Sequence, residues 1–233
     1  MIKKFIVIAV AAAITGSASA QVLYNQDPHT PGATGGNGLS TFGGALAGVT
    51  YDRELADDFT VTGPGWVVTH VDMTGIWAVA PFQRDPTSWD VRFYTDTGTG
   101  PAATAAFSPL MVGQVGTDTG MTWFSRGGRS WVIDIDDTVL APGTWWVSIQ
   151  PQADENFFQL TSTPTTPING SEAYLRDVNG NGYPLTWGTT TVQFGVPHDL
   201  AFSVHGTVVP EPATMAALGL GVVALLRRRR KSA

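Results

Sequence analysis

Short segments in which apolar and polar residues alternate recur along the central part of the chain. Four of them follow a period of two residues: 66–76, 89–95, 131–136 and 145–150. A period of two is that of a β-strand with one buried and one wet face. In residues 131–136, for example, Trp131 and Ile133 share one face while Asp134 and Asp136 share the other. The pattern predicts strands that each cover a hydrophobic core.

Further strand candidates are shorter and are bounded by turn residues such as those at 63–65. They lie at 56–62, 121–125, 173–176, 190–194 and 200–206. No segment between them shows a convincing helical stripe of period 3.6. Many short strands without intervening helices favour an all-β fold, an antiparallel β-sandwich, over a parallel α/β sheet. With roughly eight to ten strands, the predicted form is jelly-roll-like.

The segment before these strands differs in composition. Residues 21–48 are dense in Gly, Pro, Thr and Asn and contain few apolar side chains. We therefore predict a loose, Gly/Pro-rich N-terminal arm over residues 21–53, in which only residues 22–24 pair with a strand. The sandwich domain is then expected over residues 54–209.

The N-terminus has the order of features typical of a secretory signal peptide. Lys3 and Lys4 precede an apolar run at 5–14, and the small residues Ala18 and Ala20 form a small-x-small cleavage site before Gln21. Residues 1–20 are therefore predicted to be removed by signal peptidase, and the mature chain to begin at Gln21.

The C-terminus combines two prolines, an apolar run and a cluster of cations. Pro210-Glu211-Pro212 forms a spacer that cannot continue a helix. The 14 uncharged residues 213–226 would form a helix of about 21 Å, which is short for a bilayer core of about 30 Å. Five cations end the run and predict a stop-transfer signal on the cytoplasmic side of the inner membrane: Arg227, Arg228, Arg229, Arg230 and Lys231.

These three features, in this order and at the end of the chain, resemble the PEP-CTERM sorting signal. The resemblance covers residues 210–233. It implies a bacterial cell-envelope protein that is a substrate of an exosortase-type transpeptidase, with Pro210, Glu211 and Pro212 as the recognition box. It also implies export, initial anchoring in the inner membrane, and a final place in the envelope, at the cell surface or outside the cell. A plain short membrane tail is the alternative.

Three strings in the predicted sandwich also resemble parts of uncharacterised proteins that carry this same tail. They lie at 56–61, 92–96 and 143–149. This resemblance supports a single sandwich domain and implies no activity.

Composition excludes several classes of function. Residues 21–209 hold six arginines and eighteen acids, a net charge of −12 against −6 for the whole chain, so nucleic acid is not an expected partner. Without cysteine, no disulfide or thiolate metal site can form. All eight tryptophans lie in the same segment, which favours a large aromatic core.

One short segment resembles the opening of a calcium loop. Oxygen-bearing side chains occupy its positions 1, 3 and 5, at Asp177, Asn179 and Asn181, and Gly182 follows. The closing bidentate acid is missing, because position 12 is Gly188. Asp199 or Glu172 would have to serve as an outside ligand. The alternative is a type I′ hairpin turn at one of the two Asn-Gly pairs.

The remaining acids and the histidines give no constellation specific for catalysis. Asp57 and Asp58 are adjacent on a strand, so they are expected on opposite faces, one buried and one exposed. We interpret them, and the acids at 134–137, as solvated or turn-forming rather than as a glycosidase pair. The four histidines, at 29, 70, 198 and 205, lack the spacing of metal ligands, so a metal role would require them to converge in space.

Tryptophan supports two interpretations. Trp131 and Trp145 share faces with aliphatic residues and are predicted to lie in the core, whereas Trp146 and Trp187 are candidates for stacking on sugar rings. The sequence as a whole predicts an exported, non-enzymatic protein with a structural or adhesive role. A carbohydrate-binding module, with or without calcium and with surface polysaccharide as its partner, is the alternative, and a hydrolase comes third.

Overall fold

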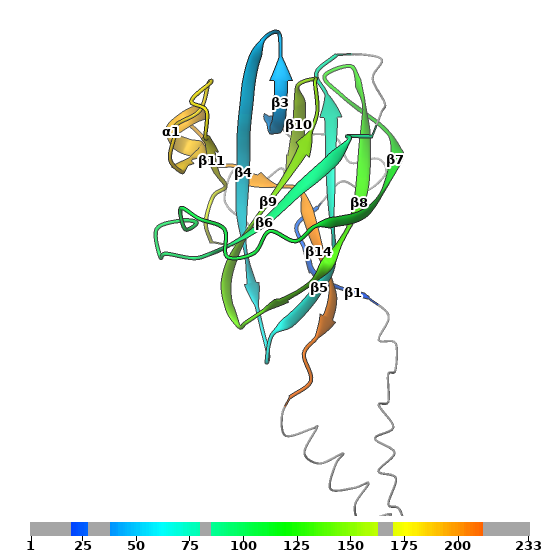
Figure 1. Cartoon of the computed structure of the whole chain (residues 1–233), viewed down its shortest axis with the longest axis vertical. Helices are drawn as coiled ribbons and strands as arrows, with labels where there is room; N and C mark the ends of the chain where they lie inside the picture. Colours follow the sequence, from blue (N-terminus) through cyan, green and yellow to red (C-terminus); the bar gives the residue numbers. More distant parts are fainter. Residues whose placement is uncertain (1–19, 28–37, 80–84, 163–169, 212–233) are drawn as a thin grey trace, which may run out of the picture.

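The structure is a computed structural model that describes residues 20–27, 38–79, 85–162 and 170–211 (Figure 1). The signal peptide except Ala20, together with Pro212, the apolar run 213–226 and the basic tail 227–231, lies outside these residues. Within the described ranges, no helix is long and apolar enough to cross a membrane.

Two β-sheets make up most of the fold. The first sheet has eight strands: β1 (Gln21–Asn25), β2 (Gly38–Ser40), β5 (Trp66–Trp77), β7 (Met111–Trp123), β8 (Arg126–Leu140), β10 (Phe157–Ser162), β13 (Asp199–Leu200) and β14 (Phe202–Val208). The second sheet has six: β3 (Phe42–Leu46), β4 (Val49–Val61), β6 (Ser88–Thr95), β9 (Gly143–Gln152), β11 (Tyr174–Asp177) and β12 (Gly188–Thr189). This confirms the prediction of a mostly β fold with paired antiparallel strands.

Pairing within the sheets is antiparallel except between β3 and β9, which run parallel at Gly43 and Gln152. β5 is central in the first sheet, with β8 along one edge and β14 and β10 along the other. From β4 to β11 the chain crosses between the sheets at every connection except the β7–β8 hairpin. The jelly-roll form stays a prediction, and these crossings are compatible with it.

The core lies between the two sheets and is rich in aromatic rings. Phe59 of β4 packs against Trp66 of β5 and Phe202 of β14 in the first sheet, with ring centroids 6.0 and 6.3 Å apart. Trp131 is fully buried and Trp145 is 8% exposed. The prediction that both tryptophans lie in the core is confirmed, as the alternation of their strands indicates.

The predicted loose arm over residues 21–53 is wrong for the residues of it that the structure describes. β1 pairs with β14, β2 with β10, and β3 with β4 and β9. Leu39 and Phe42 are 4% and 0% exposed. The glycines of this segment do not keep it out of the sheets, because Leu39 and Phe42 are buried in the shared core, although Val22 and Val49 are exposed. The sandwich therefore begins at Gln21 rather than at Glu54.

Residues 190–194 form a helix and not the predicted strand. In α1 (Thr190–Phe194), Thr189 is the N-cap and its side chain accepts a hydrogen bond from the Val192 amide. Gly195 ends the helix in the left-handed conformation, at φ 79°. The caps decide the local conformation here, since Val192 is 80% exposed and contributes little to packing.

The alternation predicted for residues 66–76 is interrupted once. Val68, Val71 and Met73 are buried, whereas His70 and Asp72 are only partly buried. Against β14, His70 pairs with His205 and Val68 pairs with Gly206, so Thr69 is an extra residue in β5. This β-bulge shifts the face on which the following side chains lie.

Candidate functional site

The first and last strands of the sandwich, β1 and β14, are neighbours in the first sheet. Gln21 of β1 pairs with Gly206 of β14, and the two strands lie in the lower part of the sandwich in Figure 1. β14 ends at Val208, and the Val209 amide donates a hydrogen bond to the Gly65 carbonyl. Pro210 and Glu211 follow at once and are exposed. The predicted recognition box therefore emerges directly from the sheet, next to the predicted start of the mature chain.

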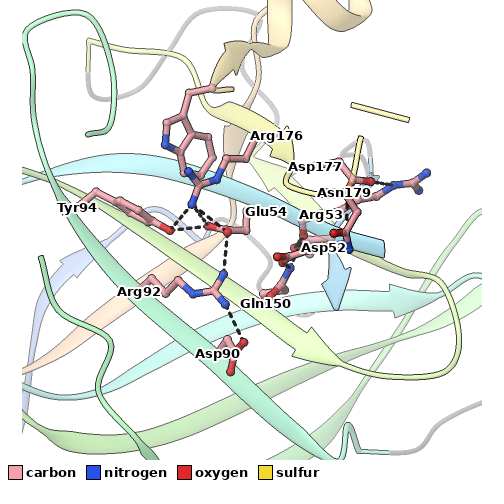
Figure 2. Close-up of polar contacts among 12 residues, drawn as sticks. Asp52, Arg53, Glu54, Asp90, Arg92, Tyr94, Gln150, Arg176, Asp177 and Asn179 are labelled. Carbon is pink, nitrogen blue, oxygen red and sulfur yellow. Dashed lines mark hydrogen bonds and ion pairs between the residues drawn. The ribbon is translucent and has the colours of Figure 1, made fainter. Parts of the chain in front are cut away.

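A buried ion cluster occupies the outer side of the second sheet (Figure 2). Glu54 of β4 is 2% exposed and lies 2.8 Å from an Arg92 guanidinium nitrogen and 3.0 Å from one of Arg176. The Tyr94 hydroxyl donates to the same carboxylate over 2.5 Å. Burial, with Glu54 as the second cause, raises the pKa of Tyr94. The cluster joins β4, β6 and β11, and each of its charges has a partner.

The two predicted sugar-stacking tryptophans lie beside this cluster. Trp146 is 1% exposed and packs against Tyr174, with ring centroids 5.0 Å apart. A covered ring cannot stack on a sugar, so the prediction for Trp146 is wrong. Trp187 is partly buried, and the Arg176 guanidinium lies 4.2 Å from its ring centroid. Its indole nitrogen donates to the Ala102 carbonyl. The Arg176 guanidinium therefore covers one face of the Trp187 ring, and only part of the side chain is open to solvent.

The predicted calcium loop holds an arginine. The Arg53 guanidinium lies 3.5 Å from the Asp177 carboxylate and donates to the Asn181 carbonyl over 2.6 Å. The side-chain amides of Asn179 and Asn181 both donate to the Thr50 carbonyl, 3.4 and 2.7 Å away. The loop thus has an internal cation where the prediction places the metal. These contacts oppose calcium binding at Asp177.

One of the two outside ligands named for that loop, Glu172, has other partners. Glu172 accepts hydrogen bonds from the Thr190 hydroxyl and the Thr191 amide. The turn itself is also not type I′, since among the Asn-Gly pairs only the glycines have positive φ. The Gly180 amide donates to the Asp177 carbonyl and the Asn179 amide to the Asp177 carboxylate, an arrangement typical of a type I turn.

The acid pair Asp57 and Asp58 is buried on both sides of β4, which corrects the expectation that one of the two would be exposed. Asp57 is 1% exposed and accepts hydrogen bonds from Gln26 and from the Leu200 amide, 2.7 and 2.6 Å away. Asp58 is 4% exposed and lines a pocket of about 390 Å³. Burial, followed by the charge of Asp199, raises the pKa of Asp57 well above its usual range and that of Asp58 to about 7.

The pocket beside Asp58 is polar. Its other lining residues include Asp96 and Thr99 of the loop after β6, Ser171, and Tyr174 at the start of β11. The Tyr174 hydroxyl donates to the Thr99 carbonyl over 2.8 Å, and the Trp146 indole donates to Asp96 over 2.9 Å. Carboxylates can accept hydrogen bonds from sugar hydroxyls, and an aromatic ring beside them can stack on a sugar face.

Two of the four histidines meet on the opposite sheet. His70 of β5 and His205 of β14 stack with ring centroids 4.3 Å apart, and His205 lies 2.8 Å from Asp72. The spacing of histidines in the sequence did not indicate this, because the two come from strands far apart in the chain. The one signal was the pair His70 and Asp72, two residues apart on the polar face of a single strand.

Comparison with known proteins recognises the tail alone. Residues 208–231 match the protein family described as "PEP-CTERM protein-sorting motif". No curated protein matches the chain, and no solved structure matches it. The match confirms the resemblance based on Pro210, Glu211, Pro212 and the basic tail. It indicates an exported protein sorted by an exosortase, made as a membrane-anchored precursor.

Proposed function

We propose that this chain is a non-enzymatic protein of the bacterial envelope or extracellular matrix, with a structural or adhesive role. The observation that carries the proposal is the sorting motif, which begins at Val208, the last residue of β14. The strand order keeps the chain ends together, because β1 and β14 are neighbours. The sandwich is then delivered as one unit, held at one end until the tail is processed.

The contacts of Glu54 and Asp57 support a non-enzymatic role, whereas Asp58 lines the polar pocket. Glu54 is held by two arginines, and Asp57 by Gln26 and a backbone amide. Groups fixed in this way stabilise the sheet and are not available to exchange protons with a substrate. The surface charge of residues 21–209 suits an exposed domain that stays soluble and attracts cations.

Deletion of the gene in the bacterium that encodes the chain tests the role. We expect the deletion strain to attach to surfaces or to aggregate less than the parent. Complementation with the wild-type chain should restore the phenotype, and so should the control Glu155→Gln, an acid far from the sorting motif in sequence. The variant Glu211→Gln, in the recognition box, should complement poorly. A deletion strain that attaches and aggregates like the parent contradicts the adhesive role.

The second candidate is a carbohydrate-binding module, and the polar pocket between Asp58, Asp96 and Tyr174 favours it. The candidate site thus moves away from Trp146, which is covered. A glycan array probed with the mature chain, with and without a chelator, measures this activity. Binding that is lost in Asp96→Asn but kept in Asp137→Asn, an exposed acid of β8, supports the module. An array without bound glycans contradicts it.

A further inference from the structure

Two histidines and one aspartate converge on the outer face of the first sheet. The ligand atoms of His70, Asp72 and His205 all lie within 4.8 Å of one another. Nε2 of His205 is 2.8 Å from a carboxylate oxygen of Asp72, and the two imidazole rings are stacked with an interplanar angle of 20°. All three side chains are partly buried, so their surroundings restrict their movement while solvent can still reach them.

The β-bulge of β5 creates this convergence. Because Thr69 is the extra residue, His70 pairs directly with His205, and Asp72 pairs with Ser203 two positions further along β14. Directly paired residues of antiparallel strands place their side chains on the same face, about 5 Å apart. The bulge needs a glycine opposite it, since a Cβ on Gly206 would lie 1.9 Å from the Val67 carbonyl oxygen.

We propose that His70, Asp72 and His205 bind one zinc-class transition-metal ion. Zinc takes imidazole nitrogen at about 2.0–2.1 Å and carboxylate oxygen at about 2.0–2.2 Å, usually in a tetrahedron. The ligand atoms of such a site are about 3.3 Å apart. The three groups are already close to that spacing, so small side-chain rotations complete the site.

The surroundings favour a cation. The Thr69 hydroxyl lies 3.2 Å from Nδ1 of His70, a contact that can hold the ring and leave Nε2 for the ion. Asp134 of β8 pairs with His70 from the other side and adds negative charge on the same face. Three protein ligands leave one coordination position for water or for a group of another molecule.

A simple ion pair between His205 and Asp72 is the competing explanation for this arrangement. An ion pair uses only those two groups and gives His70 no role. Metal binding uses all three, and it forms bonds that can be measured separately from folding. The contribution of His70 therefore distinguishes the two explanations.

Zinc binding to the full chain in detergent, after treatment with a chelator, is the direct test. Calorimetric titration with zinc alone should give one ion per chain. His70→Gln, Asp72→Asn and His205→Gln should each weaken binding by about tenfold or more, as expected when a ligand is lost. Asp136→Asn, which removes an exposed acid of β8, should bind zinc like the wild type. Urea midpoints of all variants check that each is folded.

A measurement on the wild-type chain complements the variants. Nuclear magnetic resonance of the histidine rings should show zinc-dependent shifts for His70 and His205 and none for His198, which lies elsewhere and is 8% exposed. Cobalt in place of zinc should show the visible bands of a four-coordinate ion. Absence of stoichiometric binding, or wild-type affinity in His70→Gln, would overturn the proposal and leave the ion pair.

Discussion

At the scale of single residues, the strongest interactions are those of buried charges. On the outer side of the second sheet, the Glu54 carboxylate contacts the guanidinium groups of Arg92 and Arg176 (Figure 2). It also accepts a hydrogen bond from the Tyr94 hydroxyl. Removing the Glu54 carboxylate leaves two partly buried guanidinium groups without their shared partner, although Arg92 keeps its ion pair with Asp90. The cost is larger than the net contribution of the intact cluster, because desolvation of the remaining charges is not repaid.

We therefore expect Glu54→Gln to be strongly destabilising. The loss should be about 3–5 kcal/mol in the free energy of unfolding, because Arg92 and Arg176 keep their charges in a buried site. Urea unfolding followed by tryptophan fluorescence measures it. Glu155→Gln makes the same chemical change outside the cluster and should cost less than about 0.5 kcal/mol. Equal midpoints for the two variants would contradict this account of the cluster.

Asp58 should make stability depend on pH. In the folded chain it keeps its proton up to about pH 7, whereas the same carboxyl titrates at 3.8 in the unfolded chain. Between these values the folded state binds more protons, so the free energy of unfolding falls as pH rises from about 4 to about 7 and then levels off. The decline from this group is on the order of 4 kcal/mol.

Thermal or urea unfolding at a series of pH values tests the prediction. Asp58→Asn should show a smaller decline than the wild type, and a residual decline should remain because the pKa of Asp57 is raised for the same reason. Asp137→Asn, at an exposed position, should keep the wild-type profile. A profile for Asp58→Asn that runs parallel to the wild type would show that Asp58 does not titrate in this way.

The alternation of residues predicted which face a side chain takes but not what covers that face. Trp145 and Trp146 do lie on opposite faces of β9, as expected. Both are buried, however, because Tyr174 of β11 packs over Trp146. The loop at Asp177 shows the same limit, since its oxygens suit a cation and Arg53, from a distant strand, supplies one.

At the scale of elements, a β-bulge in β5 sets the register between β5 and β14 in the first sheet. The bulge at Thr69 aligns His70 with His205, and Gly206 lets the two backbones approach. A pattern with a period of two contains no sign of an extra residue. Strict alternation through residues 66–76 would put Val68 on the same face as His70, whereas Val68 is buried. The strand was predictable, and its interruption was not.

Gly206→Ala should disturb this element in particular. Its Cβ would lie 1.9 Å from the Val67 carbonyl oxygen, so the backbone must shift, at a cost of about 1–3 kcal/mol. Chemical denaturation measures the loss. Gly188→Ala is the control, because its Cβ would meet Pro184 at an ordinary distance of 3.4 Å. Similar stability of the two variants would mean that the bulge does not need glycine.

Strands were predicted well where apolar and polar residues alternate clearly, even when the partner strand is distant in the chain. β5, β6, β8 and β9 fall within or around the predicted segments. β7 was found only at its C-terminal end, because among the described residues it pairs with β8 alone and all but one of its residues are exposed or only partly buried. β2 was missed because its partner β10 lies more than 100 residues away in the chain. β3 was missed although its main partner is the adjacent β4, because its glycines hide the apolar alternation.

At the scale of the whole molecule, the sorting motif directly follows the last strand of the sandwich. The first residue of the predicted mature chain and the last strand before the sorting motif are paired neighbours. If the predicted signal peptide and the sorting tail are both removed, the two cleavages occur at the same end of the sandwich (Figure 1) and leave the two sheets intact. The tail was the part of the chain whose function the sequence predicted best, because its signal is local and needs no folded context.

The mass of the mature C-terminus tests the central claim most directly. The full chain is expressed in a host with and without an exosortase, and the exported product is measured by intact mass spectrometry. With the enzyme, the product should begin at Gln21 and lack the basic tail 227–231; without the enzyme, the tail should remain. A product that keeps all five terminal cations in the presence of an active exosortase would contradict the account.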